Sequence, residues 1–71
     1  MIRLHHLSRD RDAFFLNPDL IERLESTPDT MVTLTTGAKI AVDEDVDVVV
    51  AKVADWRTQI AVNALKLANK S

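Results

Sequence analysis

Three turn signals divide residues 17–42 into short segments and restrict what this part of the chain can form. Asn17-Pro18-Asp19 and Thr27-Pro28-Asp29-Thr30 each combine a proline with side chains that close turns. Gly37, the only glycine, marks a third turn because glycine adopts a positive φ at little cost. The segments between these turns, such as Met31–Thr35, are rich in β-branched residues. This pattern predicts a series of short strands.

The N-terminal part of the chain continues the same pattern. Residues 1–7 alternate loosely between apolar and polar side chains, which predicts a strand. Ser8–Asp12 is a charged turn, and residues 13–16 predict a second strand. Pro28 and Asp29 occupy the central positions expected in a type I turn. Because short loops join all the strands, we expect an antiparallel meander of four or five strands over residues 1–42.

The segment from residue 20 to residue 26 fits two interpretations. Leu20, Ile21 and Leu24 have helical spacing, whereas Leu20, Glu22 and Leu24 have the spacing of one face of a strand. The segment is short and has a proline on either side. We favour a strand, with a helical turn at residues 18–20.

From Asp43 onwards the pattern becomes helical. Four acidic residues crowd a position where negative charge meets the positive end of a helix dipole and caps free N–H groups. They are Asp43, Glu44, Asp45 and Asp47. Apolar residues then recur at steps of three and four, which predicts a helix from about residue 45 or 46 to residue 67. The fold class expected for residues 1–71 is a single α+β domain, an antiparallel sheet followed by one C-terminal helix.

These patterns also predict a core. One face of the sheet and one stripe of the helix should pack together. The expected core residues are Leu4, Phe14, Leu16, Leu20, Leu24, Val32, Leu34, Ile40, Val42, Val46, Val49 and Val53.

Composition excludes several functional classes. The chain has 71 residues, a net charge of -2 and no cysteine. The basic surface that drives phosphate binding is therefore missing overall, and we expect no nucleic acid partner. No stretch reaches the roughly 18 apolar residues that a transmembrane helix needs. The N-terminus lacks the apolar run of a signal peptide. We expect a protein that stays inside the cell.

The sequence contains no motif for catalysis. It has no nucleophile elbow, no glycine loop for phosphate and no cysteine nucleophile, so we expect neither an enzyme nor a cofactor. His5 and His6 are adjacent in a predicted strand and should point to opposite faces, and no third ligand accompanies them. The acidic cluster at residues 43–47 lacks the spacing of a calcium loop. We expect no metal site.

The C-terminal helix carries more apolar surface than the sheet can cover. A helix over residues 46–67 is roughly 30 Å long, whereas a strand of six residues spans about 20 Å. Its second half either frays or pairs with another chain, and we favour pairing in a homo-oligomer or with a partner. A second apolar stripe runs through Val50, Ala54, Ala61, Leu65 and Ala68. The expected interface residues are Trp56, Ile60, Asn63, Ala64, Leu65 and Leu67, with Trp56 as the anchor and Asn63 fixing the register.

Several strings of residues resemble the FlbD/SwrD family of small bacterial flagellar and swarming-motility proteins. The most specific are Asn17-Pro18-Asp19-Leu20-Ile21-Glu22 and Thr27-Pro28-Asp29-Thr30, at their present spacing. The other matching residues are Met1–Leu4, Phe14–Leu16, Leu34-Thr35, Gly37, Val46, Val49 and Val53. The resemblance covers roughly residues 1–57.

The resemblance implies a role in flagellar motility or swarming, through support of the motor and its stators. It implies that the protein has no enzymatic activity. We expect the protein in the cytoplasm, peripheral to the membrane at the flagellar base. Two features depart from the family. Ser8–Asp12 lacks the glycine of the family's short Asn-Gly turn, and residues 60–71 extend beyond its usual core.

A second function remains open. Small regulators that bind nucleic acid are also built from five strands and a helix. Here the basic residues are scattered among acidic ones, so the sequence favours a protein that acts through protein contacts.

Overall fold

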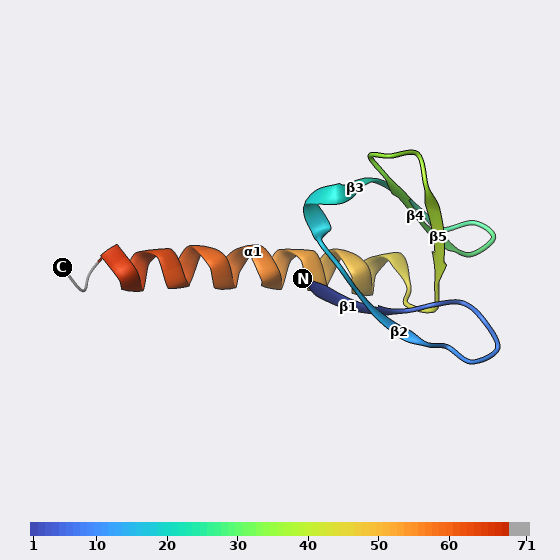
Figure 1. Ribbon diagram of the computed structural model, residues 1–71, viewed down its shortest axis with the longest axis horizontal. Coiled ribbons are helices and arrows are strands. Elements are labelled where there is room, and N and C mark those ends of the chain that lie inside the picture. Colours follow the sequence, from blue (N-terminus) through green and yellow to red (C-terminus); the bar gives the residue numbers. More distant parts are fainter. Residues whose placement is uncertain (69–71) are drawn as a thin grey trace.

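Five strands and a short 3-10 turn precede one long helix, as the ribbon in Figure 1 shows. The computed structural model describes residues 1–68, and side chains of the final helix up to residue 66. The elements are β1 (Ile2–His5), β2 (Ala13–Leu16), η1 (Pro18–Leu20), β3 (Ile21–Glu25), β4 (Thr30–Leu34), β5 (Lys39–Val42) and α1 (Val46–Ala68). The predicted α+β class is confirmed, and the predicted helix agrees within a residue at its start and its end.

The strands form two antiparallel sheets rather than one continuous meander. β1 pairs with β2, and β3, β4 and β5 form a second sheet in that order. Neither sheet pairs β2 with β3, because η1 lies between these two strands and turns the chain away from the first sheet. The prediction of four or five short antiparallel strands is confirmed, and their division into two sheets was not predicted.

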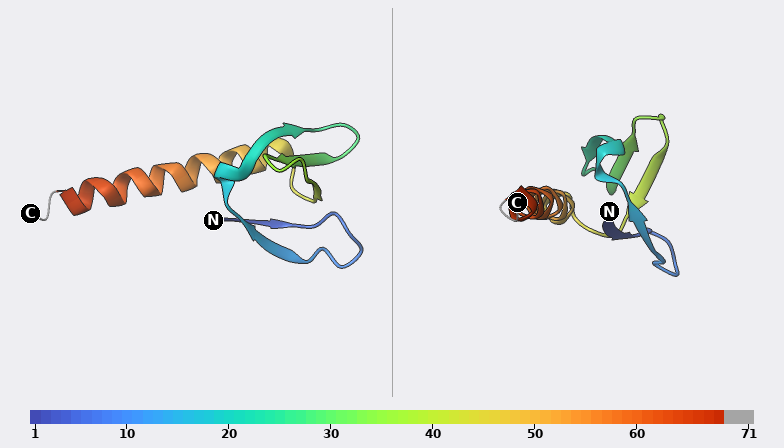
Figure 2. Two further views of the ribbon diagram at one scale, coloured as in Figure 1. Left: turned by 45° about the horizontal axis from the view of Figure 1, so that its top comes forward. Right: turned by 60° about the vertical axis from the view of Figure 1, so that its left-hand side comes forward.

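The two sheets meet along the end of β1. His6 forms an isolated antiparallel bridge with Val42. The Leu7 N–H donates to the Ala41 carbonyl at 3.0 Å, and the Asp43 N–H donates to the His5 carbonyl at 2.9 Å. The extension of β1 therefore runs beside the end of β5. Figure 2 shows both sheets on the same side of the helix.

The ambiguous segment after residue 17 contains both of the expected elements. The Asn17 side chain accepts a hydrogen bond from the Asp19 N–H at 3.0 Å, which begins the 3-10 turn. Strand β3 follows immediately, with a shift of register against β4 between Ile21 and Arg23. The prediction of a strand preceded by a helical turn is confirmed.

Two positions in the turns have a left-handed backbone. Gly37 has φ 91°, and its N–H donates to the Leu34 carbonyl at 2.9 Å in the turn between β4 and β5. Arg11 has φ 47° in the loop between β1 and β2, which contains no glycine. Arg11 therefore adopts a conformation that glycine adopts most cheaply. The loop between β3 and β4 contains a cis peptide bond at Thr27–Pro28.

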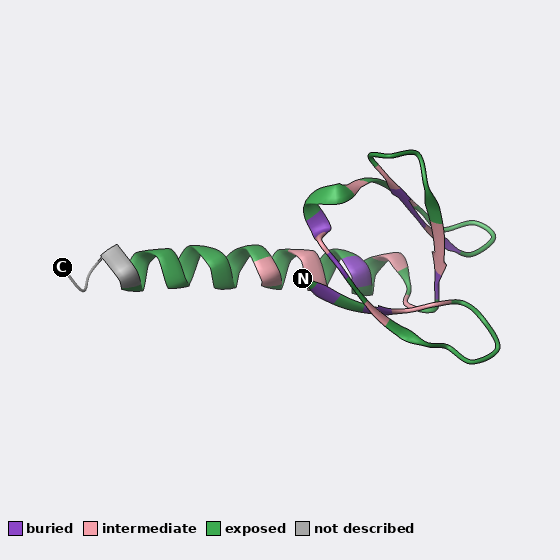
Figure 3. Ribbon diagram, in the orientation of Figure 1, coloured by how far each residue is buried: buried purple, intermediate pink, exposed green. Residues whose placement is uncertain are grey.

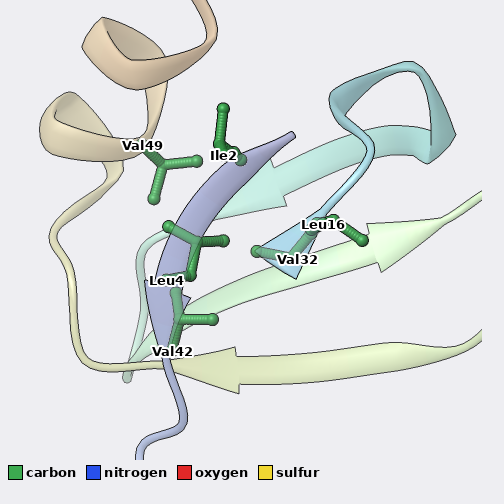
Figure 4. Packing of buried hydrophobic residues seen from close by; sticks show 6 residues of the cluster. All are labelled: Ile2, Leu4, Leu16, Val32, Val42 and Val49. Atoms are coloured by element: carbon green, nitrogen blue, oxygen red, sulfur yellow. The ribbon is translucent and has the colours of Figure 1, made fainter. Parts of the chain in front are cut away.

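The core lies where β1 passes between the helix and the second sheet (Figure 4). Leu4, Val32 and Val49 have no exposed surface, and they come from a different element each. The buried apolar residues are Ile2, Leu4, Leu16, Val32, Val42 and Val49. Phe14, Ile21, Leu24, Leu34, Ile40, Val53 and Trp56 pack against them while staying partly exposed. Most of the predicted core is confirmed.

The core prediction was wrong at two positions and missed others. Val46 is half-buried and lines the polar hollow at the start of the helix, outside the core cluster. Leu20 is 42% exposed, because it belongs to the 3-10 turn and lies outside the strand. Ile21 takes the inward position instead, and Ile2 is also buried. The helix makes its main contact with β1, so residues of β1 contribute more to the core than the sequence suggested.

The burial of Leu4 and the exposure of Leu20 predict different effects for a matched pair of substitutions. Leu4→Ala removes a fully buried side chain and should lower the free energy of unfolding by about 2–5 kcal/mol. Leu20→Ala, the same change on an exposed turn, should alter it by less than about 1 kcal/mol. Thermal unfolding followed by circular dichroism measures both. Equal effects of the two substitutions would show that this core is incorrect.

Candidate functional site

The second half of α1 extends beyond both sheets. The molecule measures 49 × 23 × 19 Å, and the long dimension follows the helix (Figure 1). Residues 57–66 are all exposed, as the burial colours in Figure 3 show. Ile60 is 50% exposed and Leu65 is 65% exposed. Contiguous exposed apolar surface, in contrast to single scattered residues, marks interaction sites.

The structure separates the predicted interface residues into two groups. Trp56 packs against the core and is half-buried, so it joins the sheet-covering half of the helix to the projecting half. Ile60, Asn63, Ala64 and Leu65 are exposed on the projecting half. The side chain of Leu67 lies outside the described residues.

An apolar groove lies between the first half of α1 and the turn that leads into β3. Its volume is about 350 Å³. Its lining residues are Pro18, Ile21 and Leu24 on the sheet side, and Val50, Val53, Ala54 and Arg57 on the helix side. Val50, 51% exposed, leaves the groove open to a ligand or partner. The sequence did not predict this groove, since its two walls are more than 20 residues apart.

Polar groups border this groove at both ends. The Arg57 guanidinium lies 3.9 Å from the Asp19 carboxylate on η1, where both side chains are exposed. At the start of the helix, a polar hollow is lined by Ser26, Thr30, Asp45 and Asp47, together with Leu24 and Val46. The groove thus has an arginine at one end and acidic residues at the other.

The start of the helix is held to β1 by Glu44. The His5 N–H donates to one carboxylate oxygen of Glu44 at 2.9 Å, and His5 Nδ1 lies 2.6 Å from the other. The Glu44 side chain is 12% exposed, whereas that of His5 is 37% exposed. The sequence predicts that Glu44 belongs to the helix cap, but its side chain bonds across to a strand that is 39 residues distant in sequence.

These contacts shift the titration of the carboxyl group. Burial alone would raise the pKa of Glu44. Hydrogen bonds from the His5 ring, the His5 backbone and the Glu44 backbone outweigh burial, so the pKa of Glu44 lies below its ordinary value of 4.5. The charged form is therefore the one that the folded protein stabilises.

The two histidines have different partners. His5 faces Glu44, and the ring of His6 stacks on Phe14 with centroids 4.2 Å apart. Within residues 1–68, the structure brings together no cluster of three or more His, Cys, Asp or Glu side chains placed to hold a metal ion. In the same part of the chain, no helical segment combines the length and apolar character needed to cross a bilayer.

The sequence of residues 1–61 indicates a biological role, which the geometry alone does not. Residues 1–61 match the family model FlbD, described as flagellar and swarming motility proteins. The chain belongs to this family. Its role therefore lies in flagellar or swarming motility. No curated protein and no solved structure shows significant similarity to it.

The match to FlbD covers the functional surfaces unequally. It includes both sheets, the groove and the helix through Ala61, a few residues further than the resemblance had indicated. Leu65 and Lys66 lie in the projecting part of α1 beyond the match. The groove thus lies within the residues that match the family model, whereas the last exposed residues of the projecting helix lie beyond them.

The contact between Glu44 and His5 predicts a pH dependence of stability. Because the pKa of Glu44 is lowered by folding, its contribution is present above about pH 4.5 and is lost as the pH falls through the folded-state pKa. Glu44→Gln should cost about 1–3 kcal/mol near neutral pH. The difference from the wild type should shrink as the pH falls.

Thermal unfolding between neutral and acidic pH measures this difference. Glu22→Gln, which changes an exposed residue of β3, serves as the matched control and should have little effect at any pH. A Glu44→Gln penalty that is the same at acidic and neutral pH would contradict the assignment.

Proposed function

We propose that this FlbD-family protein supports flagellar motility without catalysing a reaction, by making protein contacts through α1. The single observation that carries the proposal is the exposure of Ile60 and Leu65 on a helix that extends past the sheets. Apolar side chains in this position contribute to stability only when another protein covers them, at about 25 cal/mol per Å² of buried area.

The proposed contact surface includes the groove and the projecting helix. Trp56 lies between them and supplies a large aromatic side chain, the residue type that dominates interface energies. Partners consistent with the family are a second copy of the chain and a component of the flagellar motor or its stators. We propose that the protein acts in the cytoplasm, peripheral to the membrane at the flagellar base.

A swarming assay tests this function in cells that carry the gene. Deletion should impair swarming, and the wild-type gene should restore it. A double variant, Ile60→Asp with Leu65→Asp, should fail to restore swarming because it places charge on the contact surface. Ser8→Asp, which adds the same kind of charge in the exposed loop between β1 and β2 and outside α1, should restore swarming.

Protein levels and co-purification with the tagged protein identify the cause of any swarming defect. Both variants should accumulate to the wild-type level and keep a mixed α and β circular dichroism spectrum, since none of the three positions is buried. Tagged wild-type protein should retain motor or stator components, and the double variant should retain at least about tenfold less. Full swarming by the double variant would contradict the proposed surface.

A further inference from the structure

The helix wall of the groove and part of the projecting helix share one stripe of α1, with Arg57 and Thr58 at its centre. Val50 and Ala54 line the groove. Ala61 and Leu65 continue the stripe on the projecting half, where they are exposed. From Val50 to Leu65 the stripe is about 22 Å long at the α-helical rise of ~1.5 Å per residue.

The residues of this stripe are arranged symmetrically about the peptide bond between Arg57 and Thr58. Val50 precedes Arg57 by seven residues, and Leu65 follows Thr58 by seven. Ala54 precedes Arg57 by three residues, and Ala61 follows Thr58 by three. A two-fold axis through this point would place the large residues opposite each other and the two alanines opposite each other. This is the self-complementarity that a two-fold interface requires.

We propose that the groove is occupied by the projecting helix of a second copy, in an antiparallel pair of α1 helices. The inference rests on the proposed role of α1 in protein contacts, and it names the partner and the orientation. Leu65 of the second copy lies in the groove, against Val50 and Ala54. The symmetry of the pair fills both grooves at once, and the small alanines let the two helices approach closely.

Charge along the helix favours the antiparallel orientation. Residues 43–56 contain five acidic residues and one lysine. Residues 57–71 contain three basic residues and no acidic one. In the antiparallel pair, Lys66 of the second copy lies opposite residue 49, within about one turn of Asp45 and Asp47 in the polar hollow. A parallel pair would instead bring like charges together.

Arg57 lies near the proposed axis, where two arginines approach each other. Its guanidinium is 3.9 Å from Asp19 of its own chain, which reduces the repulsion between the two arginines. The aliphatic part of the side chain lines the groove and adds apolar area to it. The centre of the pair is therefore compatible with association.

Cysteine cross-linking tests both the pairing and its direction, because the native chain has no cysteine. Ala54→Cys and Ala61→Cys are prepared as separate full-length proteins, one of them with a tag that changes its mass. In the antiparallel pair, a cysteine introduced at position 54 faces a cysteine introduced at position 61 of the second copy. Two cysteines that are both at position 54 are about 10 Å apart along the axis, beyond the ~7 Å limit for a disulfide.

Under mild oxidation, the mixture of the two variants should yield at least about fivefold more linked dimer than either variant alone. Gln59→Cys mixed with Ala54→Cys is the matched control and should give only the background level. Linked dimer from Ala54→Cys alone would indicate parallel pairing and would overturn the proposal. Background levels in every combination would overturn it as well.

Sedimentation equilibrium measures the affinity without a covalent link. The wild type should form dimers at micromolar concentration, and Leu65→Asp should weaken the dimer at least about tenfold. Gln59→Asp should leave the affinity within about twofold. Unchanged circular dichroism spectra would show that all three proteins are folded. A wild type that stays monomeric at high micromolar concentration would overturn the proposal.

The same variants separate this inference from the proposed function. If the wild type is monomeric and Leu65→Asp abolishes swarming, the helix pair is incorrect and the proposed motility contact stands. If the wild type is dimeric and swarming survives Leu65→Asp, the helix pair stands and the proposed role of this surface in motility is incorrect.

Discussion

The placement of β1 between the helix and the second sheet is the interaction on which the rest of the structure depends. Ile2 and Leu4 point into the core, where Val49 of α1 covers them (Figure 4). One edge of β1 pairs with β2, and its extension bonds to the end of β5. Glu44 then binds the end of the strand to the start of the helix. One four-residue strand thus joins both sheets and α1.

Local signals explain why so much of this fold could be predicted from the sequence. Proline, glycine and acidic residues act on the backbone within a few positions, so the turns and the start of the helix were recognisable. The prediction that Leu20 belongs to the core was wrong for a local reason that the sequence did not reveal. The register shift after Ile21 lets Ile21 and Leu24, three residues apart, face the core together, whereas strict alternation pairs Leu20 with Leu24.

The candidate site was predictable only in its projecting part. Exposure of Ile60 and Leu65 follows from the length of the helix relative to the strands, which is a property of the sequence pattern. The groove and the bond between His5 and Glu44 depend on which distant segments meet. The groove needs η1, β3 and α1 together, and the bond joins residues 39 positions apart. The periodicity of apolar residues along the sequence does not indicate which distant segments come into contact.

The packed half of the helix also prepares the projecting half for binding. An isolated helix of about ten residues is marginal in water because its first turn is costly to form. Residues 57–66 avoid this cost, since they continue a helix that Val49, Val53 and Trp56 already anchor to the core. Alanine has the highest helix propensity, and the projecting half is rich in it. The exposed stripe is therefore ordered before a partner arrives, so less of the binding energy is spent on ordering it.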